Sequence, residues 1–368
     1  MRVAMYYNNK DIRLEEMPKP EPGPNELVMR VEASGICGSD VMEWYRVKKA
    51  PLVLGHEIAG VVEKAGAGVT AYKKGDRIAA AHHVPCNTCH YCLNGHHTVC
   101  DTLRQTNFYP GGFAEYVRLP AINVDRGVFR LPDDVSFEEA TFIEPLACVL
   151  RGQRLAGLKP GQSVIVIGSG IAGLLHIKCA VALGAGKIFA TDINQYRLNT
   201  AKRFGASRCF DTGRSVSDAA TAESRPNREG IGAEVVINAN EDIPYRLKQE
   251  NQGRLADLVI LCTGATSAVK QALDLAERGG TILLFASPNE EEISIPMRKL
   301  FWRNEITLTS SYAGNQSDHL AALELIRSRK ITVKDMITHR FGLAETVKGF
   351  QLTAHPDNSI KVIIEPQR

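Results

Sequence analysis

The segment SVIVIGSGIAGLLHIKCAVALGA, residues 163–185, constrains the fold of this chain more than any other stretch. A short apolar run is followed by the hexapeptide GSGIAG, Gly168 to Gly173, and then by a longer apolar stretch. This order predicts a buried strand, a tight glycine turn and a helix, which is the context in which G-x-G-x-x-G binds a dinucleotide. The glycines permit the turn and the close approach of a pyrophosphate to the N-terminus of the helix.

A carboxylate in the next predicted strand makes the motif specific. Asp192 follows Gly173 by nineteen residues, at the end of KIFATD. A carboxylate at this place accepts hydrogen bonds from both ribose hydroxyls of NAD and repels the 2′-phosphate of NADP. The structural alternative is the same turn in a unit that binds no nucleotide. We predict NAD as a cofactor, contacted by Gly168, Gly170, Ile171, Gly173, Asp192, Arg197 and Thr263.

The pattern of predicted strands and helices changes twice along the chain. Residues 1–152 contain short alternating strands and turns, typical of an irregular antiparallel barrel. Residues 153–312 alternate apolar strands with helices, which predicts a doubly wound parallel sheet. A barrel-like pattern returns in residues 313–368. We therefore predict an α/β protein in which a Rossmann domain is inserted into a β-barrel domain.

Composition excludes several classes of function. The chain has 368 residues with 44 basic and 41 acidic side chains, a net charge of +3. This balance gives no reason to expect nucleic acid or an anionic membrane as a partner. The first residues lack the apolar core of a signal peptide, and the longest apolar run is interrupted by glycines, His176 and Lys178. We expect a cytoplasmic protein.

Four cysteines fall within fifteen positions, in the segment CNTCHYCLNGHHTVC, residues 86–100. A disulfide knot, a redox pair and a metal site are the three interpretations. A reducing cytosol disfavours disulfides, and Cys-x-x-Cys redox chemistry needs two thiols rather than four. Thiolates at this spacing can converge on one tetrahedral ion and leave no open position. We predict a closed structural zinc site formed by Cys86, Cys89, Cys92 and Cys100.

A second metal site is indicated by residues that are far apart in the sequence. Cys37 lies in GICGSD between glycines and polar residues, His56 and Glu57 are adjacent in LGHEIAG, and Glu144 precedes proline in FIEPLA. Each is a weak signal alone, but together they form a nitrogen, sulfur and oxygen donor set. Three protein ligands and one open position make a catalytic zinc site, at which the metal acts as a Lewis acid on an alcohol oxygen.

These motifs together resemble those of the zinc-dependent medium-chain alcohol dehydrogenases, in the branch of sorbitol and threonine dehydrogenases. The matching segments are GICGSD, GHEIAG, the four-cysteine lobe, GGFAEYV, EPLACVLR, GSGIAG with Asp192, and CTGA. The resemblance implies a GroES-like catalytic domain split by a Rossmann domain. It also implies two zinc ions per chain, one held by the four cysteines and a catalytic one held by Cys37, His56 and an acid. Glu144 stands where liver-type enzymes have cysteine, and Glu57 is either a ligand or one water away.

The same resemblance assigns a proton relay to Ser39, two residues after Cys37. Three features depart from the family pattern. Met42 replaces the histidine that passes the proton to solvent, so the outlet must use a ribose hydroxyl, water or an acid such as Glu43. Ser311 replaces the arginine of an Arg-Tyr pair, which weakens the case for sorbitol itself. Residues 207–232 look like a polar insertion on the surface, far from the zinc.

The resulting expectation is an NAD-dependent enzyme that oxidises a secondary alcohol, such as a polyol or cyclitol, to a ketone. L-Threonine or another amino alcohol is the alternative substrate. A zinc-free enzyme similar to the quinone reductases, and a binding protein without catalysis, are the alternative classes. We expect a small alcohol or ketone as the only partner besides a second copy of the chain, in a homodimer or homotetramer.

Overall fold

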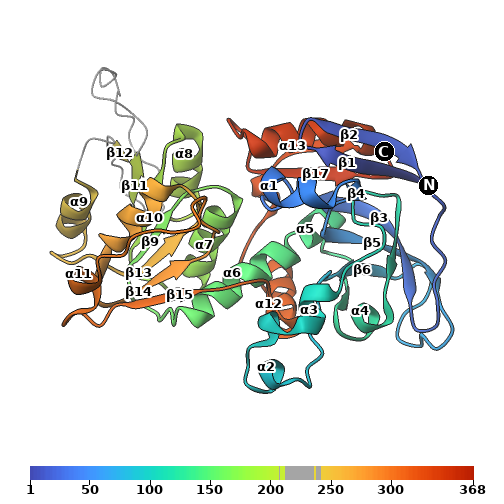
Figure 1. Ribbon diagram of the computed structural model, residues 1–368, viewed down its shortest axis with the longest axis horizontal. Coiled ribbons are helices and arrows are strands. Elements are labelled where there is room, and N and C mark those ends of the chain that lie inside the picture. Colours follow the sequence, from blue (N-terminus) through green and yellow to red (C-terminus); the bar gives the residue numbers. More distant parts are fainter. Residues whose placement is uncertain (207, 212–235, 238–241) are drawn as a thin grey trace. The chain divides into compact units, whose positions relative to one another are not determined.

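The computed structural model describes residues 1–206, 208–211, 236–237 and 242–368 (Figure 1). The chain divides into two compact units, one made of Met1–Cys148 with Ala313–Arg368 and the other of Val149–Tyr312. None of the described helices is both long and apolar enough to cross a membrane.

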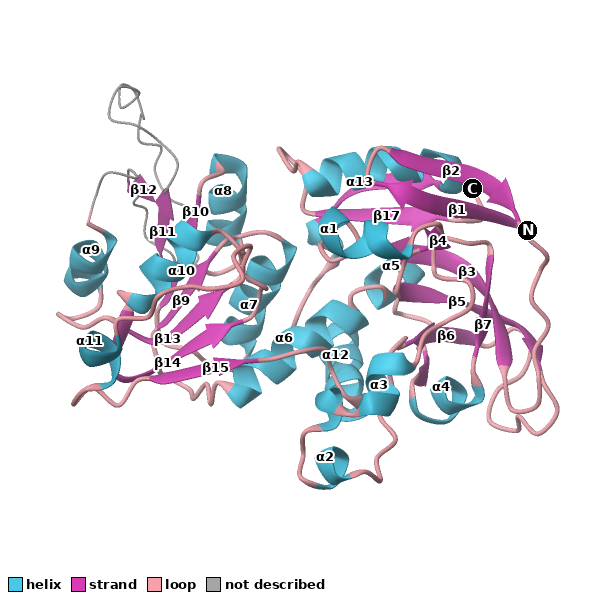
Figure 2. Ribbon diagram, viewed as in Figure 1, coloured by secondary structure: helices cyan, strands magenta, loops and turns pink. Residues whose placement is uncertain are grey.

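The described residues of the second unit form a parallel sheet of seven strands in the order β12-β11-β10-β9-β13-β14-β15. Its strands are β9 (Val164–Ile167), β10 (Ile188–Asp192), β11 (Arg208–Asp211), β12 (Val236–Ile237), β13 (Ala256–Leu261), β14 (Ala276–Leu284) and β15 (Thr307–Ser310). The helices are α7 (Ile171–Ala182), α8 (Gln195–Arg203), α9 (Ile243–Glu250), α10 (Thr266–Leu273) and α11 (Met297–Phe301). Figure 2 shows helices on both sides of this sheet.

The central strands of this unit are apolar throughout because both faces of the sheet are covered. All four residues of β9 are buried, and so are all five of β10. The strand order changes direction between β9, which is followed by the glycine turn, and β13. In open parallel sheets this switch point is where ligands bind, at the carboxyl ends of the strands. The fold class predicted from the sequence is confirmed in this unit.

The first unit contains two sheets. The smaller has the order β2-β1-β4, and the larger has the order β16-β17-β3-β5-β6-β8, with β7 paired to β3. The strands are β1 (Arg2–Asn8), β2 (Asp11–Glu16), β3 (Leu27–Gly35), β4 (Leu52–Val53), β5 (Glu57–Ala65), β6 (Arg77–Ala80), β7 (Tyr116–Leu119), β8 (Val128–Arg130), β16 (Ile337–Gly342) and β17 (Lys361–Glu365). The core of this unit contains strand side chains such as Tyr6, Met29 and Ile58, together with Phe113 from a loop and Phe350 from a helix.

Short helices connect the strands of the first unit. They are α1 (Glu43–Arg46), α2 (His90–Leu93), α3 (Asp101–Gln105), α4 (Ala121–Arg126), α5 (Phe137–Ala140), α12 (Gln316–Arg327) and α13 (Thr346–Ala354), and α6 (Ile143–Leu155) begins in this unit. Single 3-10 turns occur at Val47–Lys49, His97–Val99, Lys334–Met336 and Leu343–Glu345. Helix α12 begins with a capping box, in which Asn315 and Asp318 each bind the other's backbone N–H.

Two expectations from the sequence need correction. The proposed insertion at 207–232 begins too early, because residues 208–211 form strand β11, paired in parallel with β10. The remainder of that segment, 212–232, lies outside the described residues. The barrel is also not wholly antiparallel, since β16 pairs in parallel with β17. In both places a short, polar strand carries no clear alternation of apolar side chains, so periodicity does not reveal it.

Gly173 provides a test of the close packing between α7 and the turn that precedes it. A Cβ at Gly173 would lie 1.9 Å from the carbonyl oxygen of Gly168, whereas a Cβ at Gly170 would meet nothing closer than the Arg197 guanidinium at 3.8 Å. We expect Gly173→Ala to lower the free energy of unfolding by about 1–3 kcal/mol. Gly170→Ala, the matched control, should change it by less than about 0.5–1 kcal/mol. Urea unfolding without nucleotide measures both, and equal midpoints would contradict the packing argument.

Candidate active site and metal centres

The pairing of β3 with β5 brings Cys37 and His56 together. Gly35, at the end of β3, lies opposite Glu57, at the start of β5. Cys37 therefore follows one strand at the same edge of the sheet where His56 precedes the other. The thiol of Cys37, a ring nitrogen of His56 and a carboxylate oxygen of Glu57 all lie within 4.8 Å of one another. Cys37 thus forms one donor cluster with two residues that follow it by nineteen and twenty positions.

A fully buried carboxylate, that of Asp40, contacts both Cys37 and His56. It accepts a hydrogen bond from the backbone N–H of Cys37 at 3.0 Å and lies 3.4 Å from Nδ1 of His56. Arg46 approaches the same carboxylate at 3.6 Å. Asp40 and Arg46 were not identified from the sequence, although GICGSD contains the aspartate. A carboxylate on the second ring nitrogen fixes the orientation of a metal-binding histidine.

The electrostatics of the cluster favour a cation. Burial lowers the pKa of His56, but the negative charges of Asp40 and Cys37 outweigh burial and hold this pKa well above its usual range. Burial raises the pKa of Asp40, but His56, Arg46 and the Cys37 N–H outweigh it and keep the pKa lowered. One oxygen of Asp40 is buried without a hydrogen-bond partner among the described residues. The cluster thus has the donor types and the negative charge that zinc requires.

Glu57 is paired with a residue that sequence reasoning missed. Its carboxylate binds the ammonium group of Lys361, and the two side chains are 1% and 0% exposed. Lys361 also donates to the carbonyl of Ile36 at 3.2 Å. A Cβ at Gly35 would lie 2.1 Å from the Glu57 carboxylate, so only glycine leaves room for this pair. No motif indicates Lys361, because 304 residues separate it from Glu57.

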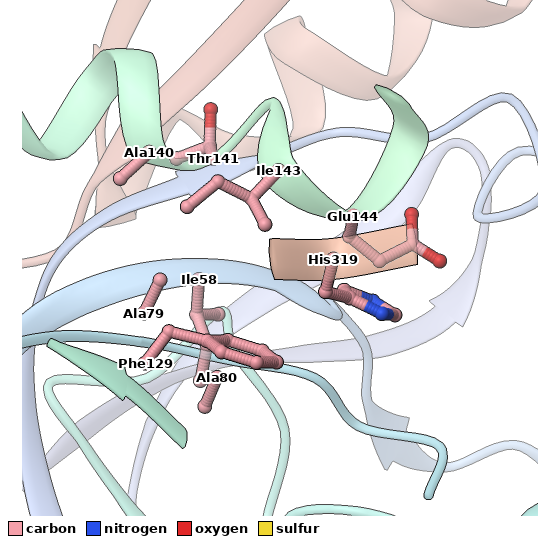
Figure 3. Close-up of a pocket in the computed structure, with 9 residues that line it drawn as sticks. All are labelled: Ile58, Ala79, Ala80, Phe129, Ala140, Thr141, Ile143, Glu144 and His319. Carbon is pink, nitrogen blue, oxygen red and sulfur yellow. The ribbon is translucent and has the colours of Figure 1, made fainter. Parts of the chain in front are cut away.

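Glu144 lies in the first turn of α6 and is not among the three residues of the tight cluster. Its carboxylate accepts from the thiol of Cys148, one turn later, at 3.5 Å. Burial raises the pKa of Glu144, the charge of His56 lowers it, and that of Glu57 raises it again, so the net direction is upward. Figure 3 shows the carboxylate beside the ring of His319, at a small cavity.

Ser39 lies beside the cluster, with its hydroxyl 3.4 Å from the Cys37 sulfur. Arg46 donates to the same hydroxyl at 3.2 Å and to the Ser39 carbonyl at 2.9 Å. Met42 precedes helix α1, where its thioether cannot carry a proton. The carboxylate of Glu43 accepts the backbone N–H of Asn9 at 3.1 Å. The Glu43 carboxylate is thus bound to the turn that follows β1. Arg46 is a polar side chain that reaches the Ser39 hydroxyl.

The four cysteines of the lobe at 86–100 converge on one point. Their sulfur atoms are 3.6 Å apart for Cys89 and Cys92, 3.6 Å for Cys86 and Cys100, and 4.0 Å for Cys86 and Cys92. A tetrahedral zinc with Zn–S distances of about 2.3 Å separates its sulfurs by about 3.8 Å. The backbone N–H of Thr88 helps to lower the pKa of Cys86 to about 5, which favours the thiolate. The eight cysteines whose side chains are described are all free thiols.

The glycine turn after β9 has the geometry of a nucleotide site. Gly168 has φ +91°, and Gly170 precedes the first helical residue, Ile171. Asp192, 6% exposed, accepts the backbone N–H of Ser169 at 2.7 Å and that of Asn194 at 2.8 Å. Arg197 lies 3.9 Å from this carboxylate, and a Cβ at Gly168 would lie 3.1 Å from Cβ of Thr263. The seven residues predicted to contact a cofactor thus surround this turn.

Three models of known protein families match parts of this chain. The alcohol dehydrogenase GroES-like domain matches residues 23–133, and the zinc-binding dehydrogenase model matches residues 220–328. The C-terminal domain of alanine dehydrogenase/PNT matches residues 145–267.

Individual relatives match over nearly the whole chain. A probable D-xylulose reductase A of Aspergillus clavatus is 34% identical over 350 residues, covering 92% of this chain and 90% of the relative. The sorbitol dehydrogenase of Gallus gallus is 31% identical over 367 residues, covering 96% and 93%. Among solved structures, galactitol-1-phosphate dehydrogenase from Escherichia coli has a TM-score of 0.81 at 27% identity and covers 100% of both chains.

The chain therefore belongs to the zinc-dependent medium-chain alcohol dehydrogenases, in the sorbitol dehydrogenase-like branch. As a member of that family it is an oxidoreductase that acts on a CH–OH group with zinc and NAD. The family resemblance and the fold class expected from the sequence are both confirmed.

The buried pair of Glu57 and Lys361 provides a test of how the site is held together. Lys361→Met leaves an uncompensated buried carboxylate, so we expect a loss of about 3–5 kcal/mol in the free energy of unfolding. The double variant Glu57→Gln with Lys361→Met removes both charges and should recover most of that loss. Urea unfolding at pH 7 measures all three proteins. A single variant as stable as the parent would show that the pair is not buried in solution.

Proposed function

We propose that this enzyme oxidises a secondary alcohol of a polyol, a cyclitol or a similar compound to a ketone, with NAD as the hydride acceptor. The observation that carries the proposal is the convergence of two soft donors, Cys37 and His56, which lie within 4.8 Å of one another and of Glu57. The Ser39 hydroxyl lies 3.4 Å from the Cys37 sulfur. The names of the relatives, sorbitol dehydrogenase and D-xylulose reductase, support a polyhydroxylated substrate.

In this proposal Cys37, His56 and Glu144 hold the catalytic zinc. Lys361 compensates the charge of Glu57, so this ion pair is neutral overall and Glu57 would support the site rather than act as the third ligand. Glu144 has no cationic side chain bound to it among the described contacts, and it therefore supplies the acidic donor. Cys86, Cys89, Cys92 and Cys100 hold the second, structural zinc. When bound, the catalytic zinc supplies Lewis-acid polarisation of the alcohol oxygen.

The residues around the cluster handle the proton. The substrate loses a hydride from its carbinol carbon and a proton from its hydroxyl, which leaves a ketone. Ser39 takes the hydroxyl proton and passes its own to a water or to a ribose hydroxyl of the cofactor. Arg46, which donates to Ser39 at 3.2 Å, fixes the direction of that hydroxyl. The carboxylate of Asp40 holds the His56 ring in one orientation by its contact with Nδ1 of that ring.

The nucleotide is proposed to bind at the turn of Gly168, Gly170 and Gly173. Asp192 uses one lone pair of each carboxylate oxygen for the backbone N–H groups of Ser169 and Asn194. A carboxylate has about four such positions, so two remain for the ribose hydroxyls. Arg197, 3.9 Å from Asp192, partly offsets the charge of that carboxylate and so reduces the repulsion that disfavours NADP.

His82 supports a substrate with more than one hydroxyl. Its ring centroid lies 4.7 Å from that of His56, and its Nδ1 is buried without a hydrogen-bond partner among the described residues. A second hydroxyl of the substrate, which both donates and accepts hydrogen bonds, offers this nitrogen a partner. The small-molecule substrate, a homo-oligomeric state and a cytoplasmic location remain predictions.

A substrate panel tests the proposed activity. We expect NADH formation with polyols and cyclitols, higher kcat/KM for vicinal diols than for the corresponding mono-alcohols, and lower kcat/KM with NADP. L-Threonine and other amino alcohols form the competing arm of the panel. Turnover confined to amino alcohols, or absent with every secondary alcohol, would overturn the proposed substrate class.

Zinc content tests the two metal sites separately. Cys37→Ala should lose one of two zinc ions and reduce kcat by at least about 10³-fold, because the alcohol is no longer polarised. Cys89→Ser, the matched control, should lose the other ion and loosen the lobe at 86–100. Elemental analysis of purified protein measures both. Two zinc ions in either variant would contradict the assignment of that site, and zero in the parent would favour the zinc-free class.

A further inference from the structure

A buried histidine on α12 has one ring nitrogen that finds no hydrogen-bond partner within the described part of the chain. His319 is 4% exposed, and its Nδ1 lies 2.7 Å from the carbonyl of Asn315. A carbonyl oxygen only accepts hydrogen bonds, so Nδ1 carries the proton. Burial disfavours a second proton on the ring. Nε2 therefore presents a lone pair, and it is buried with no hydrogen-bond partner among the described residues.

The ring of His319 is held rigidly. Phe129 stacks on it, with ring centroids 5.6 Å apart and planes 10° from parallel. Its backbone belongs to the first turn of α12, which the capping box of Asn315 and Asp318 fixes. A Cβ at Gly314 would meet Ala147 of α6 at 2.8 Å and the His319 ring at 3.2 Å, so the ring packs close to the helix that carries Glu144.

Glu144 and His319 line the same small cavity. Its volume is about 10 Å³, close to the minimum that holds one water molecule. The remaining walls are mostly apolar, formed by Ile58, Ala79, Ala80, Phe129, Ala140, Thr141 and Ile143. Figure 3 shows the imidazole and the carboxylate extending to the same side of this cavity. A neutral ring nitrogen accepts hydrogen bonds, and so does a carboxylate that binds a metal, so these two groups need a donor between them.

We propose that one buried water donates one hydrogen bond to Nε2 of His319 and the other to the carboxylate of Glu144, and that His319 thereby positions Glu144 for the metal. Water is the smallest group with two donors, and a bridging water satisfies buried polar groups almost as well as a direct hydrogen bond. The inference rests on the proposed role of Glu144 as a zinc ligand. His319 is a positioning residue, since it reaches the metal only through the water and Glu144.

Three variants of His319 and Glu144 test this inference through metal retention. Removing a hydrogen-bonded support of a metal ligand typically costs about 10–100-fold in metal affinity. We expect His319→Leu to speed the transfer of one zinc ion to a chromophoric chelator by about 10-fold or more. The second zinc, held by the four cysteines, should be released at the parental rate and serves as an internal control. His319→Gln, which keeps an acceptor, should stay close to the parent.

A merely structural role of His319 predicts a different result. Leucine would remove an unsatisfied buried nitrogen from an apolar wall, so the unfolding midpoint would stay equal or rise while zinc release remained parental. A crystal structure of the zinc-loaded protein gives the second readout. An ordered water within about 3.2 Å of both Nε2 and a Glu144 oxygen supports the inference. An empty cavity, or a direct contact between the two side chains, overturns it.

Glu144→Ala separates this inference from the proposed function. If Glu144→Ala loses one zinc ion but His319→Leu releases both ions at parental rates, the bridge is wrong and Glu144 remains a ligand. If Glu144→Ala keeps two zinc ions, the ligand assignment itself fails, and with it the role of His319.

Discussion

The register between β3 and β5 is the constraint on which the candidate active site depends. Gly35 opposite Glu57 fixes where the chain leaves one strand and enters the next, and thus where Cys37 and His56 meet. Side chains in a strand alternate between faces, so a slip of one residue would move Glu57 to the other side of the sheet. Strand β17 joins this arrangement on the other side, with Ile363 opposite Gly35, and brings Lys361 to Glu57.

Basic side chains in the interior decide which of the buried carboxylates is left to bind a metal. Three buried or partly buried carboxylates lie in or near the cluster, and two of them contact a basic side chain. Asp40 lies against His56 and Arg46, and Glu57 binds Lys361. Glu144 accepts a hydrogen bond from a thiol and lines a small cavity, and among the described residues no hydrogen bond or ion pair joins it to a basic side chain. The pattern explains how one site can contain several acids and still leave negative charge for a divalent cation.

The sequence was informative wherever the chemistry is local. The glycine turn and the spacing of Cys86, Cys89 and Cys92 each lie within a few residues, so backbone geometry alone brings their groups together. It was misleading at residues 208–211, because RCFD lacks the apolar run typical of an inner parallel strand. It was silent on Lys361, whose neighbours KVIIE indicate a buried strand but not an ion pair.

The sequence by itself determined the fold class, the family and the types of donor available for two zinc ions and a dinucleotide. These follow from short-range patterns, since turn geometry, strand burial and thiol spacing are set by neighbouring residues. Only the tertiary structure decided which acid is neutralised, which nitrogen of His319 has no partner among the described residues and which side chains contact Cys37 and His56. Those outcomes depend on strand register and on contacts such as that between Lys361 and Glu57, 304 residues apart, which no local pattern encodes.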